Sequence, residues 1–295
     1  GTCVHLFPGV AIAEEVKARD PEARVLFVGT ARGIEARVLP GSGWDLERIE
    51  VSGLKTVGIA GMIRGLVRLP RALWQSRRIL RRFRPDAVVG VGGYASGPLV
   101  LAAWLGRIPT AVLEQNSVPG LANKILGKLV RAVFIAFDET RRFFSARRVV
   151  MTGTPIRAKL RRDLTATRGH DSSAAFHLFC FGGSQGARAV SDLVVTAVQA
   201  LHRAGKNVTI VHQTGHEDRE RVAQLYAGAG VAADVRAFID DMASEYARAD
   251  LIIARSGAAT VAELGAVGRA AILIPYPHAA YDHQTINARE LVAKG

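Results

Sequence analysis

Short runs of β-branched and other apolar residues alternate along the chain with segments whose apolar residues recur every three or four positions. The first pattern is typical of buried strands and the second of amphipathic helices. Their regular alternation predicts parallel sheets built from βαβ units, and therefore an α/β fold. The predicted strands are residues 25–28, 87–91, 110–113, 133–136, 149–151, 177–181, 208–212, 235–237, 251–254 and 271–274.

The 295 residues are enough for two domains of about 150 residues each. Between the predicted strands of the two halves, residues 154–174 are polar, charged and poor in strand-forming residues, as in a linker. The same order of strand, glycine-rich turn and helix recurs on both sides. We therefore predict two similar doubly wound domains, residues 1–156 and 157–295, that face each other across a cleft.

Both ends of the chain indicate a fragment. Residues 1–5 are expected to form a turn that enters a helix at residues 11–18. In a doubly wound sheet such a turn follows the first strand, which is central, and no such strand precedes Gly1. The chain also stops at Gly295, just after a predicted helix. We expect the complete protein to have a first strand before Gly1 and a further C-terminal part.

The formal net charge of +13 predicts an anionic partner. Residues 51–85 contain nine basic and no acidic residues, with Leu and Trp side chains at helical spacing, and Pro70 is expected to divide them into two helices. A basic amphipathic helix suits an anionic membrane surface. The alternative is a helix whose apolar face packs on the protein core and whose basic face is exposed to solvent. Nucleic acid is not expected as a partner, because no nucleic-acid-binding motif accompanies these basic residues.

The remaining composition narrows the class of protein. The two cysteines, Cys3 and Cys180, have no metal-ligand spacing and indicate a reducing compartment rather than a disulfide scaffold. No apolar run reaches the length of about 18 residues that a membrane span needs. The pair Asp240 and Asp241 is interpreted as a helix start, and no metal site is predicted.

A glycine-rich turn at residues 182–187 follows the predicted strand 177–181 and opens a helix. Its glycines permit close backbone approach, and free N–H groups at a helix N-terminus favour a diphosphate. Ser184 adds a hydroxyl donor. The turn matches neither the P-loop nor the standard dinucleotide motif, and the alternative is an ordinary βα turn.

A second strand-to-helix turn spans residues 255–263. The backbone N–H groups of Ala258, Ala259 and Thr260 are placed to cap phosphate oxygens. Glu263, one turn into the helix, is suited to accept hydrogen bonds from both ribose hydroxyls. Its alternative role is that of a capping-box partner of Thr260.

Three more polar segments follow predicted strands: residues 92–98, 114–116 and 282–287. Open α/β sheets bind ligands at the carboxyl ends of their strands. His283 and Gln284 in the last segment are suited to hydrogen-bond sugar hydroxyls.

In this order and spacing, these segments resemble the peptidoglycan N-acetylglucosaminyltransferase family along nearly the whole chain. The resemblance also covers residues 119–121, 153–157, 212–215 and 238–242. It implies two Rossmann-like domains of the GT-B glycosyltransferase type, acting at the cytoplasmic face of a bacterial plasma membrane. The implied donor is UDP-N-acetylglucosamine, and the acceptor is lipid-linked muramyl-pentapeptide diphosphate. The implied reaction inverts the anomeric centre and needs no cofactor or metal.

The resemblance also implies roles for individual residues. Ser184 would contact the donor phosphates, with Ala258, Ala259 and Thr260 beside them, and Glu263 would hold the ribose. Ile239 would bind uracil through its backbone, with Arg157 nearby, while Gln284 and Asn116 would face the sugar. His5 matches the family histidine of the N-terminal loop and is the candidate base, its alternative role being to position the loop or bind the acceptor phosphate. The remaining implied substrate contacts are Thr2, Val261 and Ala262.

The N-terminal loop departs from the family pattern Gly-Gly-Thr-Gly-Gly-His, because Cys3 and Val4 replace two glycines. If they adopted the glycine conformation, their side chains would crowd an acceptor. Two other functions therefore stay open. One is a related transferase that glycosylates another lipid, such as diacylglycerol, and the other is a non-catalytic nucleotide-sugar-binding protein.

Overall fold

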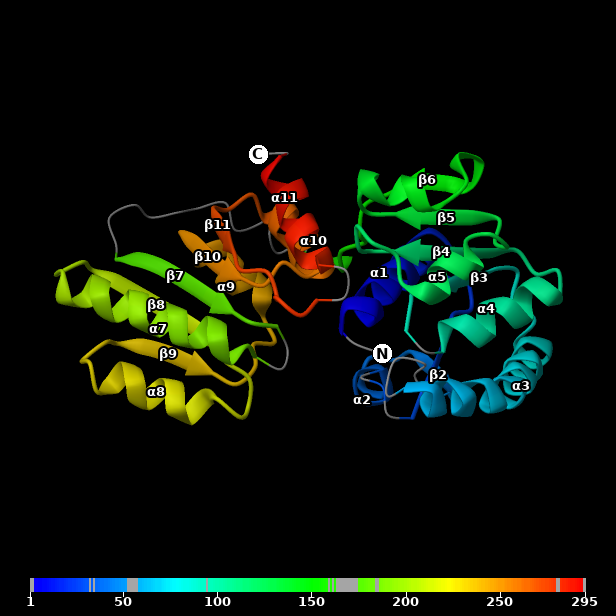
Figure 1. Ribbon diagram of the computed structural model, residues 1–295, viewed down its shortest axis with the longest axis horizontal. Coiled ribbons are helices and arrows are strands. Elements are labelled where there is room, and N and C mark those ends of the chain that lie inside the picture. The colour runs from blue at the N-terminus through cyan, green and yellow to red at the C-terminus, as the bar shows by residue number, and fades with distance from the viewer. Residues whose placement is uncertain are drawn as a thin grey trace. The chain divides into compact units, whose positions relative to one another are not determined.

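The computed structural model describes residues 3–31, 33, 35–51, 58–93, 95–158, 160, 162, 175–183, 186–279 and 282–293. Side chains are described for all of these except 3, 4, 37, 40 and 58–68. The chain divides into two compact units, Gly1–Arg157 and Ala158–Gly295, which we call unit 1 and unit 2. Their helices and strands are labelled in Figure 1.

In the described part of unit 1, strands β1 and β2 form one parallel pair, and β3, β4, β5 and β6 form a parallel sheet in that order. The strands are β1 (Leu26–Gly29), β2 (Asp45–Arg48), β3 (Val88–Gly90), β4 (Thr110–Glu114), β5 (Ala132–Ile135) and β6 (Val149–Met151). The α-helices are α1 (Cys3–Arg19), α2 (Glu35–Val38), α3 (Gly58–Phe83), α4 (Ser96–Leu105) and α5 (Leu121–Leu126). Short 3₁₀ helices occur at Leu39–Gly41, Asp138–Phe143 and Ala146–Arg148.

Strand β4 lies at the centre of the unit 1 core. Its neighbouring residues Val112 and Leu113 point to opposite faces, and both are almost fully buried. Burial on both faces is typical of a parallel sheet covered by helices, and α4 covers part of it with Val100 and Ala103. Because β3 and β4 are parallel, the segments that follow them emerge at the same edge of the sheet.

Two expectations for unit 1 are wrong. The helix predicted at residues 11–18 begins at Cys3, so residues 3–5 are helical and do not form the predicted turn. Its apolar face starts earlier than expected, since Leu6 and Val10 pack against Leu39.

Pro70 does not divide residues 51–85 into two helices, because α3 runs through it without interruption. An interior proline costs a helix about 3 kcal/mol. Burial of Ala72, Ile79 and Leu80 holds the segment after Pro70 against unit 1 and opposes that cost.

Unit 2 contains one parallel sheet in the order β11-β10-β7-β8-β9. Its strands are β7 (Phe176–Phe181), β8 (Val208–Gln213), β9 (Ala233–Arg236), β10 (Leu251–Ala254) and β11 (Ala271–Leu273). Its helices are α7 (Arg188–Arg203), α8 (Arg219–Ala227), α9 (Met242–Arg248), α10 (Ala258–Val267) and α11 (His283–Val292). Strand β7 therefore lies in the centre of the sheet, between β10 and β8, as the first strand does in a doubly wound sheet.

Alternate residues of β7 contact different helices. Leu178 and Cys180 pack with α7 and α8, whereas Phe179 and Phe181 contact Tyr246 of α9 on the opposite face. Figure 1 shows α7 and α8 along the sheet in green and yellow. The thiol of Cys180 is unpaired, and burial raises its pKa well above the usual range.

The ten predicted strands are all present, each end within two residues of its prediction, and β2 alone among the described strands was not predicted. The expected α/β class with parallel sheets is confirmed in both units. None of the helices in the described residues combines the length and the apolar character that crossing a bilayer requires.

Candidate functional site

In unit 1 the candidate base, His5, lies against the ends of β3 and β4. Its Nδ1 is 3.0 Å from Oε1 of Gln115, and Gln115 Nε2 donates to the carbonyl of Val91 at 3.1 Å. A Cβ at Gly92 would stand 2.7 Å from His5 Nδ1, so the ring packs on a bare backbone whose φ is +98°. Burial lowers the pKa of His5, opposed by the bond to Gln115 and by the charge of Glu114, so the neutral imidazole is favoured near pH 7.

Glu114 organises the segment that follows β4. Its Oε1 accepts from the backbone and side-chain N–H groups of Asn116, at 3.0 and 3.3 Å. Its Oε2 accepts from Asn123 Nδ2 at 2.9 Å and from Gly120 N at 3.2 Å. Asn116, predicted to face the sugar, is therefore held at the same sheet edge as His5, and part of its donor capacity is used by Glu114.

Two further predictions concern the N-terminus. Thr2 lies outside the described residues, and Cys3 and Val4 begin α1. Their backbone is helical and has no positive φ, so neither residue adopts the glycine conformation, and the effect of the two substitutions on the acceptor stays a prediction.

In unit 2 the turn at 182–187 connects β7 to α7, as predicted. Gly183 and Gly186 have φ values of +99° and +78°, in the region that favours glycine. A Cβ at Gly186 would stand 1.7 Å from the carbonyl oxygen of Thr214, which leaves no room for any side chain. Ser184 lies outside the described residues.

Gln213, at the end of β8, joins this turn to the segment after β9. Its Nε2 donates to the carbonyl of Gly183 at 3.1 Å, and its Oε1 accepts from the N–H of Ile239 at 2.8 Å. Gln213 is 4% exposed and Ile239 3%. The predicted uracil and diphosphate segments are thus linked by one buried amide, and because the Ile239 N–H is used by Gln213, the Ile239 carbonyl is the backbone group expected to meet uracil.

His212, the residue before Gln213, has a core role. It is buried and hydrogen-bonded to the Tyr226 hydroxyl at 3.0 Å. Burial lowers its pKa to about 4, so it stays neutral in the folded protein near pH 7.

The second turn of unit 2 leads from β10 into α10. Gly257 is the N-cap and supplies no side-chain cap, so Ala258, Ala259 and Thr260 form the first turn of the helix. The capping-box alternative is wrong, because Thr260 lies inside the helix. Val261 and Ala262 continue the helix to Glu263, whose Oε2 accepts from the hydroxyl of Tyr246 at 2.8 Å. Tyr246 itself is fully buried.

The start of α11 is tied to the start of α10. Ser256 Oγ donates to the carbonyl of Gln284 at 2.8 Å, and Asn287 Nδ2 donates to the carbonyl of Ser256 at 3.2 Å. Gln284 Oε1 accepts from the N–H of Tyr276 at 2.9 Å. This bond fixes the amide, so the Nε2 end of Gln284 is the end that a sugar hydroxyl would meet.

Specific roles were also predicted for Arg157 and Asp241. Arg157 belongs to unit 1, where its guanidinium lies 4.3 Å from the ring centroid of Phe7, so its place near uracil stays a prediction. Asp241 caps α9 by accepting from the N–H of Ser244 at 3.3 Å, which confirms the predicted helix start.

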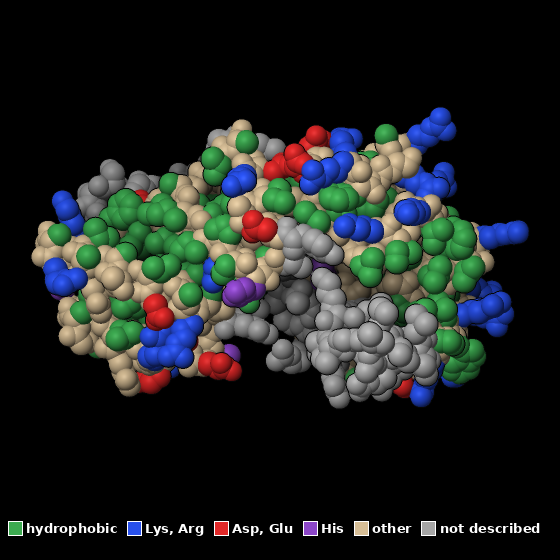
Figure 2. Space-filling view, viewed as in Figure 1, with side chains coloured by type: hydrophobic (Ala, Val, Ile, Leu, Met, Phe, Trp, Pro, Cys, Tyr) green, Lys and Arg blue, Asp and Glu red, His purple; other side chains and the backbone are tan. Residues whose placement is uncertain are grey.

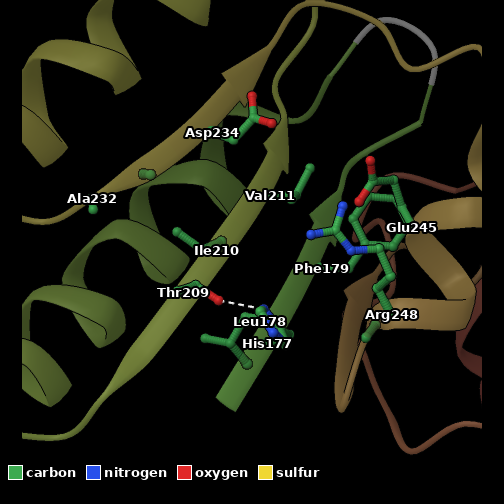
Figure 3. A pocket seen from close by; sticks show the side chains of 12 residues that line it. His177, Leu178, Phe179, Thr209, Ile210, Val211, Ala232, Asp234, Glu245 and Arg248 are labelled. Carbon is green, nitrogen blue, oxygen red and sulfur yellow. Dashed lines mark hydrogen bonds between the residues drawn. The ribbon is translucent and has the colours of Figure 1, made fainter. Parts of the chain in front are cut away.

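A pocket of about 470 Å³ in unit 2 lies along the sheet face near α9. In Figure 3, His177 and Thr209 point toward one another, and Glu245 and Arg248 project from the helix side. His177 and Thr209 belong to the amino-terminal parts of β7 and β8. The pocket contains none of the predicted donor-binding residues, which follow the carboxyl ends of the strands.

Sequence reasoning did not identify Gln115, Gln213 or Tyr246 as parts of the site. Each contacts a predicted site residue through a side chain. Gln115 and Gln213 carried a weak signal, because both stand in polar segments at the ends of predicted strands. Tyr246 carried none, since a tyrosine in an amphipathic helix usually belongs to the core.

Two family models match the chain, the glycosyltransferase family 28 N-terminal domain over residues 1–135 and its C-terminal domain over residues 177–295. A UDP-N-acetylglucosamine–N-acetylmuramyl-(pentapeptide) pyrophosphoryl-undecaprenol N-acetylglucosamine transferase of Myxococcus xanthus is 52% identical, across 100% of this chain and 76% of that protein. The transferase of the same name from Syntrophotalea carbinolica is 51% identical, across 100% of this chain and 81% of its own length.

Solved structures give a consistent result. The crystal structure of Acinetobacter baumannii MurG matches with a TM-score of 0.77 and 32% identity, covering 100% of this chain and 81% of that one. A Neisseria meningitidis UDP-GlcNAc 2-epimerase matches with a TM-score of 0.66 and 11% identity over 100% of this chain and 89% of that one, which shows a shared fold alone. The expected class of two GT-B-type domains is confirmed.

Proposed function

The chain belongs to the family of UDP-N-acetylglucosamine–N-acetylmuramyl-(pentapeptide) pyrophosphoryl-undecaprenol N-acetylglucosamine transferases, and from this we propose that it catalyses the family reaction. N-acetylglucosamine passes from UDP-N-acetylglucosamine to the muramyl sugar of undecaprenyl-diphosphate-linked muramyl-pentapeptide, a step of peptidoglycan synthesis. The proposed donor domain is residues 157–295, and the proposed acceptor and membrane domain is residues 1–156.

One observation carries the donor assignment: the two strand-to-helix turns, Gln213 and Glu263 gather at the carboxyl edge of a single parallel sheet. The carbonyl of Ile239 accepts from N3–H of uracil, and Glu263 accepts from the ribose hydroxyls. The amides of the 182–187 turn, with Ser184, and the first turn of α10 bind the diphosphate. Gln284 donates to the sugar.

The acceptor side supplies the base. The acceptor hydroxyl attacks the anomeric carbon in line while His5 takes the hydroxyl proton. The bond from the anomeric carbon to the diphosphate oxygen breaks, and UDP leaves with that electron pair. Helix N-termini stabilise the charge that develops on the diphosphate. Asn116, Thr2 and Arg157 complete the proposed substrate contacts.

Turnover of the purified protein tests the function. With UDP-N-acetylglucosamine and lipid-linked muramyl-pentapeptide, we expect UDP and a disaccharide-linked lipid in equal amounts. Diacylglycerol in place of the muramyl acceptor should give no glycolipid. Release of UDP with diacylglycerol alone would favour the related glycolipid transferase, and tight UDP binding without turnover on either acceptor would favour a non-catalytic binding protein.

We further propose that the enzyme is peripheral at the cytoplasmic face of the plasma membrane and docks through residues 51–85. The described end of α3 buries Ala72, Ile79 and Leu80, as the core-facing alternative requires. Its outer surface combines arginines with Trp74, which is 62% exposed. Figure 2 shows Lys and Arg side chains with apolar ones between them over unit 1, at the right of the view. Such a surface suits anionic lipid.

Charge reversal tests this docking. Replacing Arg77, Arg78 and Arg81 by glutamate removes about 1 kcal/mol of membrane attraction for each residue and adds repulsion. We expect sedimentation with phosphatidylglycerol vesicles to fall by at least about 100-fold in apparent affinity, while UDP affinity is unchanged. The matched control reverses Arg188, Arg203 and Lys206, which are exposed in unit 2. Equal losses in both variants would count against a specific surface on α3.

A third test concerns ribose recognition. Glu263→Ala should weaken UDP binding by about 1–3 kcal/mol, because two ribose hydroxyls lose their acceptor. Calorimetric titration with UDP and with 2′,3′-dideoxy-UDP separates this effect from general damage, since the dideoxy ligand should bind parent and variant alike. Glu220→Ala on exposed α8 is the control. An unchanged UDP affinity in Glu263→Ala would show that Glu263 does not bind the ribose.

A further inference from the structure

The side chain of Gln115 has only one orientation that satisfies both of its hydrogen bonds. Its amide nitrogen lies 3.1 Å from the carbonyl oxygen of Val91, which can only accept. The nitrogen must therefore point there, and Oε1 must be the atom that faces His5 Nδ1 at 3.0 Å. An amide oxygen also only accepts, so Nδ1 of His5 must carry the hydrogen.

We propose that Gln115 is a positioning residue that fixes His5 in the Nδ1–H tautomer and thereby makes Nε2 the proton-accepting atom of the transferase. A neutral imidazole has one N–H group, so a hydrogen on Nδ1 leaves the lone pair on Nε2. The inference rests on the proposed function for the use of that lone pair. The tautomer itself depends only on the contacts of His5.

The surroundings keep this arrangement in place. Gln115 is 1% exposed, so water does not compete for its amide. The His5 ring lies against the bare backbone of Gly92, where a side chain would collide with Nδ1 and Cε1. Rotation of the ring by half a turn would place a carbon opposite Oε1 and leave a buried acceptor unpaired, which disfavours the rotated ring.

The charged groups near His5 act on its protonation and not on the choice of tautomer. Glu114, at the end of β4, and Glu35, in α2, both favour the imidazolium form through their charge, whereas burial opposes it. The hydrogen-bonding position opposite Nδ1 is occupied by the Gln115 oxygen. A neutral amide therefore sets the tautomer of His5.

Nitrogen-15 NMR of the purified protein tests the tautomer directly, with the His5 signals assigned by their loss in His5→Gln. Above the pKa of His5, the spectrum should show a protonated Nδ1 and an unprotonated Nε2. In Gln115→Met, which keeps the volume and removes both hydrogen bonds, the Nε2–H form should become the major one. We expect kcat to fall at least about tenfold with the KM for UDP-N-acetylglucosamine within about twofold of the parent.

The matched control is Gln199→Met, at a half-buried glutamine of α7 that donates to the carbonyl of Leu225, and it should leave the tautomer and kcat unchanged. Gln115→Glu keeps an acceptor opposite Nδ1 and should retain the Nδ1–H form, which provides a second variant if Gln115→Met does not fold. An Nε2–H spectrum in the parent overturns the proposal, and so does an unchanged tautomer in Gln115→Met. Parent protein with the expected tautomer but no transferase activity refutes the proposed function and leaves the role of Gln115 intact.

Discussion

His5→Gln should lower kcat by about 10²–10⁴-fold, because the acceptor hydroxyl loses its base. Glutamine is close to histidine in size and cannot accept a proton near pH 7. Since His5 lies in unit 1 and the proposed donor site in unit 2, the KM for UDP-N-acetylglucosamine and the affinity for UDP should stay near parent values. Steady-state kinetics on the lipid-linked acceptor provides the measurement.

The pH profile adds a second readout for His5. The active base is neutral, so kcat/KM should fall as the pH drops through the pKa of His5 and level off above it. Burial lowers that pKa below the ordinary value of 6.5, which extends the active plateau to more acidic pH. This acidic limb should disappear in His5→Gln. If it persists with an undiminished rate, another residue is the base and His5 has only a positioning role.

Gly186→Ala should abolish measurable donor binding, with at least about a 100-fold loss in UDP affinity, or about 3 kcal/mol. The new Cβ would lie 1.7 Å from the carbonyl oxygen of Thr214, so the turn at 182–187 must move away from β8. The φ of +78° adds strain of about 1–3 kcal/mol for any residue with a side chain. Titration with UDP and urea unfolding measure the two effects separately.

Gly205→Ala provides the matched control for this variant. Gly205 also has a positive φ of +70°, and a Cβ there meets nothing within 4 Å. It lies in the turn between α7 and β8, away from the predicted donor residues. Its alanine variant should lose stability through backbone strain alone and keep full UDP affinity. The diphosphate role of the turn fails if Gly186→Ala binds UDP as well as Gly205→Ala does.

The sequence was sufficient where a local pattern determines local structure. The central strands β4 and β7 are apolar runs buried on two faces, and such runs have few other places in a fold. Strand β2 was missed because Asp45 and Arg48, at its two ends, are charged and its apolar content is too small for a signal. The effect of Pro70 was misjudged because tertiary packing, which the sequence does not display, supports α3 beyond it.

The site was predictable at the level of segments and not of contacts. Glycine-rich turns after strands and polar residues at strand ends mark the ligand-binding edge of a parallel sheet. The partners of these residues come from distant parts of the chain, as with His5 and Gln115, which are 110 positions apart. No local pattern connects such pairs. Pairing of Glu263 with Tyr246 instead of Thr260 likewise depends on how α9 and α10 pack.

The link that Gln213 makes between Gly183 and Ile239 has a consequence for the end of the reaction. In the proposed site, sugar transfer removes the contacts of Gln284 and Asn116, whereas uracil, ribose and diphosphate keep theirs. The segments proposed to bind uracil and diphosphate share one buried amide, so we expect neither to release its part of UDP independently of the other. We therefore expect UDP to compete strongly with fresh donor, so that the overall rate depends on how quickly the spent nucleotide departs.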